Sequence, residues 1–223
     1  MSTNTSKRVV LRKKRIEQKR RKTLKTLLIA FGAVLLISLA AFIPNLLRSQ
    51  SAVTGGEGFA IGDPDAPISV VNFSSFSCPF CESFSKTIEP DLINNFVDTG
   101  DVYYRYMNLA FSNDEGTQNA GIAAYCAADQ NLFFQYRPYL YSAAREQNGF
   151  SISNLISMAN SAGIETERFE VCLVENNDFR DALVADLRFA QSVGVTGTPS
   201  FLVNDQLVFS NELFPLLESL INE

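Results

Sequence analysis

The sequence predicts a mixed α/β fold with an inserted all-helical domain, preceded by one N-terminal transmembrane helix. Three observations support this class. An apolar run at residues 68–73 leads into a segment, residues 82–97, whose apolar residues recur at helical spacing, and a second strand-like run follows at residues 101–110. A long helical stretch then separates these elements from a short hairpin and a last helix. The uncharged segment 26–47 precedes all of them.

The membrane segment is predicted from residues 26–47, which are mostly Leu, Ile, Ala, Phe and Val. At about 1.5 Å per residue they form roughly 33 Å of helix, enough to cross a bilayer core of about 30 Å. A cleavable signal peptide is the alternative, but its apolar core spans only about 7 to 15 residues. We therefore expect a retained signal-anchor helix.

The charge is distributed unevenly around this segment. Residues 1–25 hold eleven Lys or Arg and one Glu, whereas residues 48–223 hold eight basic and 23 acidic residues. By the positive-inside rule, we expect the basic tail 1–25 to be cytoplasmic and the chain after the span to lie on the other side of the cell membrane. We interpret the basic tail as a topology signal and a lipid contact, and not as a nucleic-acid-binding arm.

Outside the membrane we expect a flexible linker and one folded domain. Residues 48–58 are rich in Ser, Gly and small residues, which is typical of a tether. Folding should begin near Phe59, so that residues 59–223 form the domain, with the helical insertion at about 115–193.

The predicted strand at residues 68–73 is followed by a helix that begins at Cys78-Pro79-Phe80-Cys81. Pro79 suits the first helical position, where its missing N–H costs nothing, so Cys78 becomes the N-cap. Free N–H groups and the helix dipole stabilise negative sulfur, so Cys78 should be acidic and reactive. Cys81 lies one turn away and could resolve a mixed disulfide at Cys78. The pair is therefore suited to thiol-disulfide exchange.

Two other interpretations of this pair are a structural disulfide and half of a zinc site. The sequence contains no histidine and no second close cysteine pair, which a structural zinc site would normally supply. We therefore expect no metal and no bound cofactor besides the redox-active cysteines.

The remaining elements follow in order. The second strand should lie parallel to the first, because strand, helix and strand form a crossover unit. Helical patterns cover residues 117–128, 132–145, 151–162, 165–175 and 179–193, with Ser151 as a cap. The aromatic residues of this block could line a groove, although we favour core positions for most of them; they are Phe133, Phe134, Tyr136, Tyr139 and Tyr141.

The C-terminal part is read as a hairpin and a helix. Residues 201–203 and 206–209 flank an Asn-Asp turn, and residues 211–222 are amphipathic. Pro199 comes just before a predicted strand, where a proline cannot donate a main-chain hydrogen bond to the neighbouring strand. A cis peptide bond after Thr198 would explain it, since cis is accessible only before proline.

These motifs together resemble the DsbA-like thiol-disulfide oxidoreductases of the thioredoxin fold. The resemblance covers residues 59–223 and is greatest to a membrane-anchored bacterial subgroup that opens like residues 62–67, Gly-Asp-Pro-Asp-Ala-Pro. It implies that Cys78 is the nucleophile and Cys81 the buried resolving thiol. It also implies that Thr198 and Pro199 form a cis-proline loop that binds extended substrates and keeps metal off the thiols.

Two positions depart from the family pattern. Phe80 stands where the best-known oxidases have histidine, which removes a positive neighbour of the first thiol. Asn72 stands where many relatives keep a buried acid, so any proton relay there would need other groups.

Cys126 and Cys172 match a second, structural disulfide that the subgroup often has in its helical block. An oxidising compartment would favour such a bond. Two free buried cysteines, or a relay serving the active pair, are the alternatives.

The sequence thus predicts an extracytoplasmic enzyme that introduces disulfides into secreted or cell-envelope proteins. The resemblance implies cysteine-containing or unfolded secreted proteins as substrates and a quinone-linked membrane protein as reoxidant. A reductase or isomerase of the same fold is one alternative, and a non-catalytic peptide-binding module is another.

Overall fold

The computed structural model describes residues 59–110, 114–175 and 177–222. The expected cytoplasmic tail, membrane span and linker lie outside these residues. Within the described ranges, no helix has both the length and the apolar character needed to cross a bilayer.

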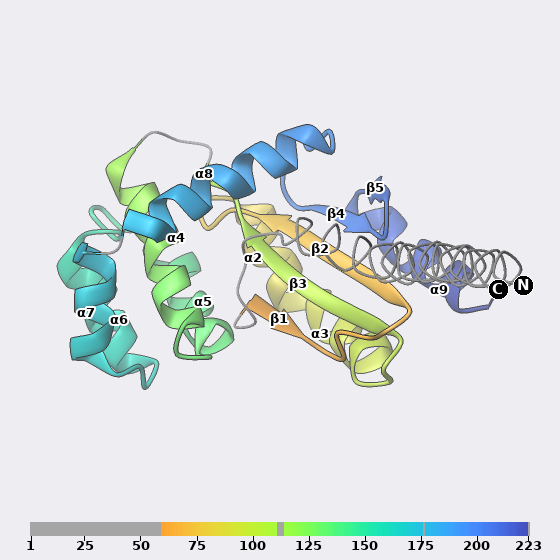
Figure 1. Ribbon diagram of the computed structural model, residues 1–223, viewed down its shortest axis with the longest axis horizontal. Helices are drawn as coiled ribbons and strands as arrows, with labels where there is room; N and C mark the ends of the chain where they lie inside the picture. Colours follow the sequence, from red (N-terminus) through yellow and green to blue (C-terminus); the bar gives the residue numbers. More distant parts are fainter. Residues whose placement is uncertain (1–58, 111–113, 176, 223) are drawn as a thin grey trace, which may run out of the picture. The chain divides into compact units, whose positions relative to one another are not determined.

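A five-stranded sheet forms the centre of the domain (Figure 1). Its spatial order is β1-β3-β2-β4-β5, with β2 and β3 parallel and every other neighbouring pair antiparallel. The parallel crossover and the hairpin predicted from the sequence are confirmed, whereas β1 was not predicted. The strands are β1 (Ala60–Ile61), β2 (Ile68–Ser74), β3 (Val102–Asn108), β4 (Ser200–Val203) and β5 (Gln206–Val208).

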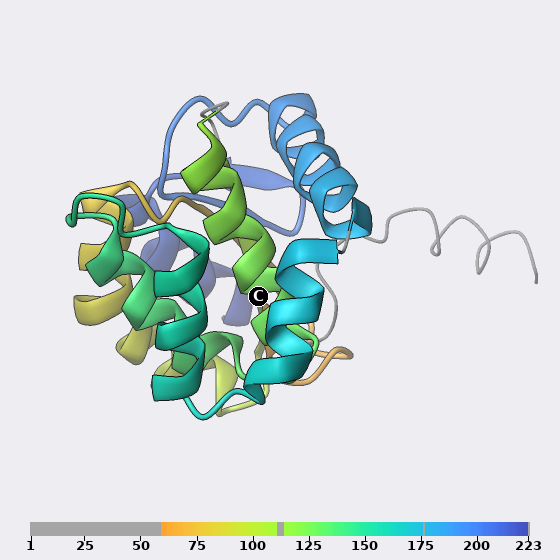
Figure 2. The same ribbon diagram turned by 90° about the vertical axis from the view of Figure 1, so that its left-hand side faces the viewer.

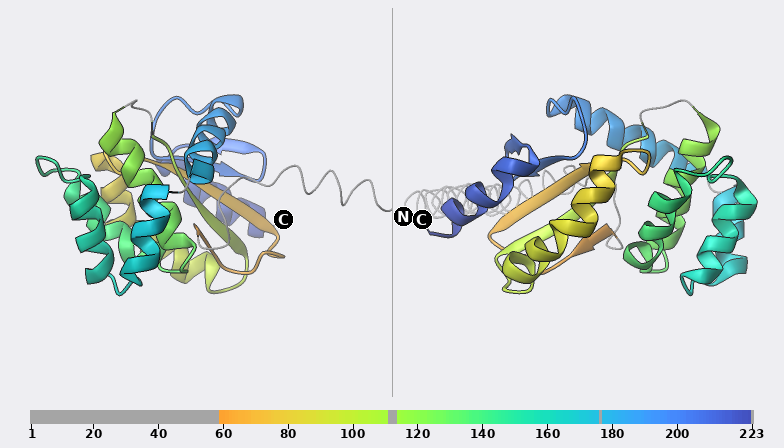
Figure 3. Two further views of the ribbon diagram at one scale, coloured as in Figure 1. Left: turned by 60° about the vertical axis from the view of Figure 1, so that its left-hand side comes forward. Right: turned by 180° about the vertical axis from the view of Figure 1, so that it is seen from behind.

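Helices cover both faces of this sheet. On one face lie α2 (Pro79–Thr87), α3 (Glu89–Leu92) and α9 (Ser210–Ile221), which the view from behind in Figure 3 shows in front of the strands. On the other face, Ala190 of α8 (Asn177–Ser192) packs with residues of β2 and β3. The alternation of side chains along each strand supplies both cores, since successive residues point to opposite faces.

The apolar spacing of residues 82–97 predicts one continuous helix after the cysteine pair. In the structure this helix is interrupted. It breaks at Ile88 and resumes as α3, which passes into a π-helical turn at Ile93–Val97. Pro90 lies within the first two residues of α3. A proline has no N–H for the preceding turn and clashes with its carbonyl, so the helix restarts there.

The helical block between β3 and β4 agrees closely with the predicted segments. Figure 2 looks onto this block, whose helices pack against one another. Ser151 occupies the N-cap of α6, but its side chain makes no capping hydrogen bond. The helices are α4 (Glu115–Ala128), α5 (Phe133–Ala143), α6 (Ile152–Ser161), α7 (Thr166–Glu175) and α8.

The aromatic residues of α5 serve mainly as core. Phe133, Tyr136 and Tyr141 are buried, and Phe134 is half-buried between two apolar clusters. Tyr139 is the exception, since it is 37% exposed and donates to the carbonyl of Ser161. The arrangement therefore favours the core interpretation over a groove lined by this set.

Candidate active site

The two free cysteines lie where β2 delivers the chain to α2. Cys78 is the N-cap, with extended backbone angles (φ −95°, ψ 114°), and Pro79 is at the start of the helix. The Cys78 Sγ accepts a hydrogen bond from the N–H of Cys81 at 3.4 Å. Cys78 is half-buried, and Cys81 is 1% exposed. The predicted position of Cys78 at the positive end of a helix is therefore confirmed.

The Thr198–Pro199 loop lies against this pair although it is far away in sequence. The Thr198–Pro199 peptide bond is cis. The Cys78 thiol donates to the Thr198 carbonyl at 3.3 Å. The loop is held there because the next residue, Ser200, begins β4 and pairs with Phe73 of β2.

The surface around Cys78 is formed by Pro79 and Phe80 of the intervening dipeptide and by the half-buried Thr198 and Pro199. Phe80 is 74% exposed, the largest exposed fraction among the exposed large hydrophobic residues of the described chain. An exposed aromatic ring beside a reactive sulfur gives an approaching polypeptide an apolar contact.

The thiols of Cys78 and Cys81 differ in pKa because their surroundings differ. Burial raises the pKa of Cys78, but hydrogen bonds with the Thr198 side chain, with Cys81 and with the Phe80 main chain outweigh it, so the pKa lies below its ordinary value. For Cys81 burial dominates and raises the pKa to about 11, although hydrogen bonds with Ser74 and Thr198 oppose it. Cys78 is thus the better thiolate, and Cys81 holds its proton.

A series of hydrogen-bonded, buried polar side chains connects β2 to the helical block. The Asn72 amide donates to the Tyr104 hydroxyl at 2.6 Å, and Tyr104 donates to Glu89 at 2.5 Å. Glu89 in turn pairs with the Arg137 guanidinium through two hydrogen bonds. Asn72 therefore fills its place as a neutral donor, with its Oδ1 atom lacking a partner.

The sequence analysis assigned no role in the redox site to Ser74, Tyr106 or Tyr141, yet these buried hydroxyls lie together behind the pair. The Ser74 hydroxyl is 3.0 Å from that of Tyr141, which is 3.1 Å from that of Tyr106. One signal was present, since Asn72 and Ser74 put two polar groups on the same side of β2 at its end nearest the cysteines.

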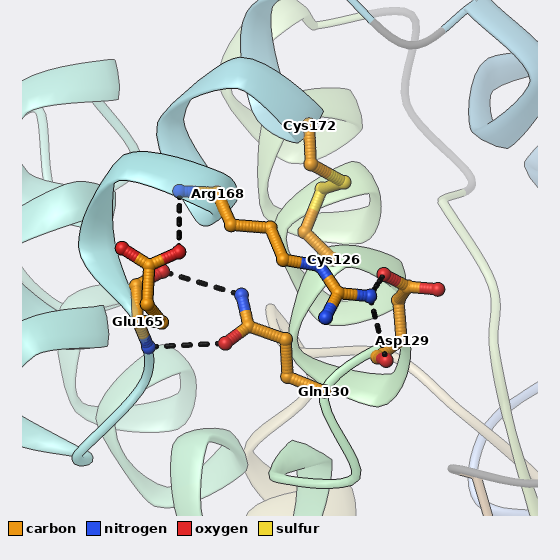
Figure 4. Close-up of a disulfide and its surroundings, with 6 residues drawn as sticks. All are labelled: Cys126, Asp129, Gln130, Glu165, Arg168 and Cys172. Atoms are coloured by element: carbon orange, nitrogen blue, oxygen red, sulfur yellow. Dashed lines mark hydrogen bonds and ion pairs between the residues drawn. A yellow bond between two sulfur atoms is a disulfide. The ribbon is translucent and has the colours of Figure 1, made fainter.

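Cys126 of α4 and Cys172 of α7 form a disulfide, shown in Figure 4. Polar contacts flank it in the same view. Gln130 exchanges hydrogen bonds with the main chain of Glu165 at 3.0 and 3.2 Å, and Arg168 pairs with Asp129. The bond ties two helices of the block together.

No group of three or more cysteine or carboxylate side chains in the described part of the chain is arranged to hold a metal ion. Cys78 and Cys81 remain as a reactive dithiol. A half-buried acidic thiol, a buried partner one turn on and an adjacent loop with main-chain carbonyls can exchange disulfides with an extended peptide.

Comparisons with known proteins agree with this geometry. A family model described as thioredoxin matches residues 54–223. The disulfide bond formation protein D of Bacillus subtilis is 28% identical over 155 residues, which are 66% of this chain and 68% of that protein. A protein of Rickettsia bellii described as a protein-disulfide oxidoreductase is 29% identical over 150 residues. That alignment covers 65% of this chain and only 56% of the relative's length.

Solved structures show the same fold. BdbD from Bacillus subtilis, in its oxidised form, superposes with a TM-score of 0.66 and is 24% identical, covering 75% of this chain and 95% of that one. DsbA from Chlamydia trachomatis gives 0.62 at 22% identity, covering 74% and 91%. With the family model spanning most of the chain, this protein belongs to the thioredoxin family and is a DsbA-like disulfide oxidoreductase.

Proposed function

We propose that this chain is a membrane-anchored oxidase that introduces disulfides into secreted or cell-envelope proteins. The observation that carries the proposal is the placement of Cys78 at the start of α2, in hydrogen-bond contact with Thr198 and Cys81. The Cys81 N–H donates to the Cys78 sulfur and, together with the Thr198 side chain, lowers the pKa of this thiol. A stabilised Cys78 thiolate stabilises the reduced enzyme, and a stable reduced form makes its disulfide a stronger oxidant. We expect cysteine-containing polypeptides as substrates, since relatives are named disulfide bond formation protein D and protein-disulfide oxidoreductase.

In the proposed cycle a substrate thiolate attacks Cys78 Sγ in the oxidised enzyme. A bond forms between the substrate sulfur and Cys78, and the Cys78–Cys81 bond breaks with its electron pair on Cys81. A second substrate thiolate then attacks the substrate sulfur of this mixed disulfide. The substrate leaves with a disulfide, and Cys78 leaves as the thiolate that its surroundings favour.

The location and the recycling partner are parts of the same proposal. A span at residues 26–47 with a basic tail before it would place the domain outside the cytoplasmic membrane, in a compartment that lets disulfides persist. There the reduced pair would pass its two electrons to a quinone-linked membrane protein. Labelling of Cys78 by a membrane-impermeant maleimide in intact cells, after mild reduction, would test the location.

The direction of exchange is tested by the redox potential. The full chain, purified in detergent, is equilibrated with reduced and oxidised glutathione, and the fraction of Cys78–Cys81 disulfide is measured by alkylation and mass spectrometry. We expect a potential near that of strong oxidants, which lie at about −120 to −180 mV. A potential near that of thioredoxin, about −270 mV, would contradict the oxidase role and favour a reductase.

The catalytic roles are tested separately with reduced, unfolded ribonuclease as substrate. The oxidised chain should restore ribonuclease activity, and Cys78→Ser should abolish this. Reduced Cys81→Ser, mixed instead with ribonuclease that carries mispaired disulfides, should attack one of them through Cys78, release a ribonuclease thiolate and accumulate the mixed disulfide, because the Cys81 thiol that would break it internally is missing. A Cys78→Ser chain that still transfers disulfides would refute the assignment, and a non-catalytic binding module would show no transfer in the unchanged chain.

A further inference from the structure

Three hydroxyl groups lie in a row behind the buried thiol of Cys81. Ser74, the last residue of β2, is 1% exposed, and its Oγ atom contacts the Tyr141 hydroxyl of α5 at 3.0 Å. Tyr141 contacts the Tyr106 hydroxyl of β3 at 3.1 Å. Cys81 is buried in the same cluster of side chains as Tyr106 and Tyr141. A hydrogen bond with Ser74 lowers the pKa of its thiol against the larger effect of burial.

Burial keeps both tyrosines in their protonated form. It raises the pKa of Tyr141 to about 12 and that of Tyr106 well above the ordinary value. A neutral tyrosine can donate, so protons in the row can all point toward the sulfur. The row also has a positive end, because the Arg137 guanidinium lies 5.4 Å from the centre of the Tyr106 ring.

The other groups near the row do not offer Cys81 a full cation. The Arg137 charge is paired with Glu89, and the carboxylate of Glu82, next to Cys81 in sequence, is paired with Lys86 and Arg145. Asn72, which stands where an acid could have exchanged a proton, is neutral and bonded to Tyr104. The stabilisation of negative charge on Cys81 must therefore come from hydrogen-bond donors. The Ser74 side chain lowers the pKa of Cys81 the most among them, and Thr198 follows.

We propose that Ser74, Tyr141 and Tyr106 form a donor chain that stabilises the Cys81 thiolate whenever the Cys78–Cys81 bond opens or closes. In this proposal the Ser74 hydroxyl donates to the reacting sulfur, and the two tyrosines are positioning residues that orient and polarise the serine hydroxyl. The inference rests on the proposed roles of the two cysteines. It adds that the Ser74 hydroxyl lets the buried Cys81 sulfur act as a leaving group in one direction and as a nucleophile in the other.

The chemistry of the opening step needs such a donor. When a substrate thiolate bonds to Cys78, the electron pair of the broken disulfide stays on Cys81, which is 1% exposed and has almost no water. A hydrogen bond from Ser74 to the charged sulfur is stronger than one to the neutral thiol. Cys81 then takes up a proton and becomes a thiol. This uptake balances the proton that the substrate thiol released when it ionised. In the reverse step the same donor raises the fraction of Cys81 that is thiolate and able to attack.

The test separates the two cysteines in one reaction. The reduced full chain, in detergent, is mixed with dithiobis-nitrobenzoate, and release of the coloured thiolate is followed by stopped flow over a range of pH. Attack by Cys78 gives the first release and leaves a mixed disulfide. Attack by Cys81 on that mixed disulfide gives the second, while Cys126 and Cys172 stay silent because they are bonded to each other.

We expect Ser74→Ala to slow the second release about tenfold near neutral pH, which corresponds to a rise of about one unit in the pKa of Cys81. Tyr141→Phe and Tyr106→Phe should slow it by roughly threefold, because each removes a donor behind the serine. The pH profile of the second release should move to higher pH in all three variants. The first release should keep its rate, and Ser74→Thr, which retains a hydroxyl, should restore the second.

Tyr136→Phe is the matched control. It also removes a buried tyrosine hydroxyl of α5, but that hydroxyl donates to the Leu155 carbonyl and lies outside the row. It should leave the pH profile of the second release unchanged. The inference is overturned if Tyr141→Phe and Tyr106→Phe behave like this control, which holds even if Ser74→Ala fails to fold. Absence of the first release in the unchanged chain would overturn the proposed function and the inference with it.

Discussion

Arg137 of α5 donates two hydrogen bonds to the carboxylate of Glu89 in α3, 48 residues away in sequence. Both residues are buried, and the guanidinium also lies 5.1 to 5.7 Å from the ring centres of Tyr106, Phe133 and Phe134. This contact joins the helical block to the element that follows the active-site helix. The Nε atom of Arg137 lacks a partner, so the guanidinium is held by the carboxylate and the rings alone.

Removing one partner of this pair should be costly. Arg137→Met leaves the Glu89 carboxylate buried without its cation, and we expect the free energy of unfolding to fall by about 3–5 kcal/mol. Urea unfolding followed by circular dichroism would measure it. The double variant Arg137→Met, Glu89→Gln should lose less than the single variant, because no unpaired charge remains.

The exposed pair of Arg168 and Asp129 provides the comparison for that measurement. Both side chains are about half exposed, so water screens their attraction. Arg168→Gln should change the free energy of unfolding by at most about 1 kcal/mol. An equal loss from Arg137→Met and Arg168→Gln would show that burial does not govern the energetics of these pairs.

Thr198→Val should raise the pKa of Cys78. Burial already pushes this pKa up, and the Thr198 side chain supplies the largest of the hydrogen bonds that bring it below the ordinary value. Because the change removes the hydroxyl and keeps the shape, the pH profile of Cys78 alkylation by iodoacetamide should shift to higher pH. Thr196→Val, on the exposed part of the same loop, should leave the profile in place.

The same lowered pKa makes the stability of the reduced protein depend on pH. A thiol whose pKa is lower in the folded state than in the unfolded state stabilises the fold above the unfolded pKa, and this stabilisation is lost as pH falls through the folded pKa. Reduced parent protein should therefore lose stability relative to Cys78→Ser as pH is lowered through that range. Thermal unfolding at a series of pH values would show it, and a constant difference between the two proteins would contradict the pKa shift.

Phe80→His should make the enzyme more oxidising. The Phe80 ring is exposed, and its main-chain N–H already contributes to lowering the pKa of Cys78. A histidine there can add positive charge near the thiolate, which favours the reduced enzyme. The glutathione equilibrium should shift toward the dithiol at a given redox ratio. Phe80→Leu, which adds no charge, should leave the equilibrium near that of the parent.

The disulfide between Cys126 and Cys172 should contribute stability but not activity. The two residues are 46 positions apart, and a loop of that length corresponds to very roughly 4 kcal/mol in the chain-entropy model. Cys126→Ala with Cys172→Ala should lower the free energy of unfolding by about this amount. Release of both thiolates from dithiobis-nitrobenzoate by Cys78 and Cys81 should continue, whereas a relay role for the second pair would alter it.

Much of the fold could be predicted from local patterns. The start of α2 at Cys78 and Pro79 depends on the chemistry of a helix N-terminus, which involves only neighbouring residues. The parallel pairing of β2 and β3 follows from the crossover between them. The helical spacing of residues 82–97 was misleading, because periodicity does not register that Pro90 cannot continue the previous turn.

The sequence alone determined that two cysteines one turn apart begin a helix, that a proline at the mouth of a strand accompanies them, and that α and β elements alternate around a helical insertion. Only the tertiary structure decided that Thr198 touches Cys78 and that Ser74, Tyr141 and Tyr106 line up behind Cys81. Local motifs depend on interactions within a few residues and can be read along the chain. The acidity of a buried sulfur depends on donors and burial that distant segments provide, and these exist only once the chain has folded.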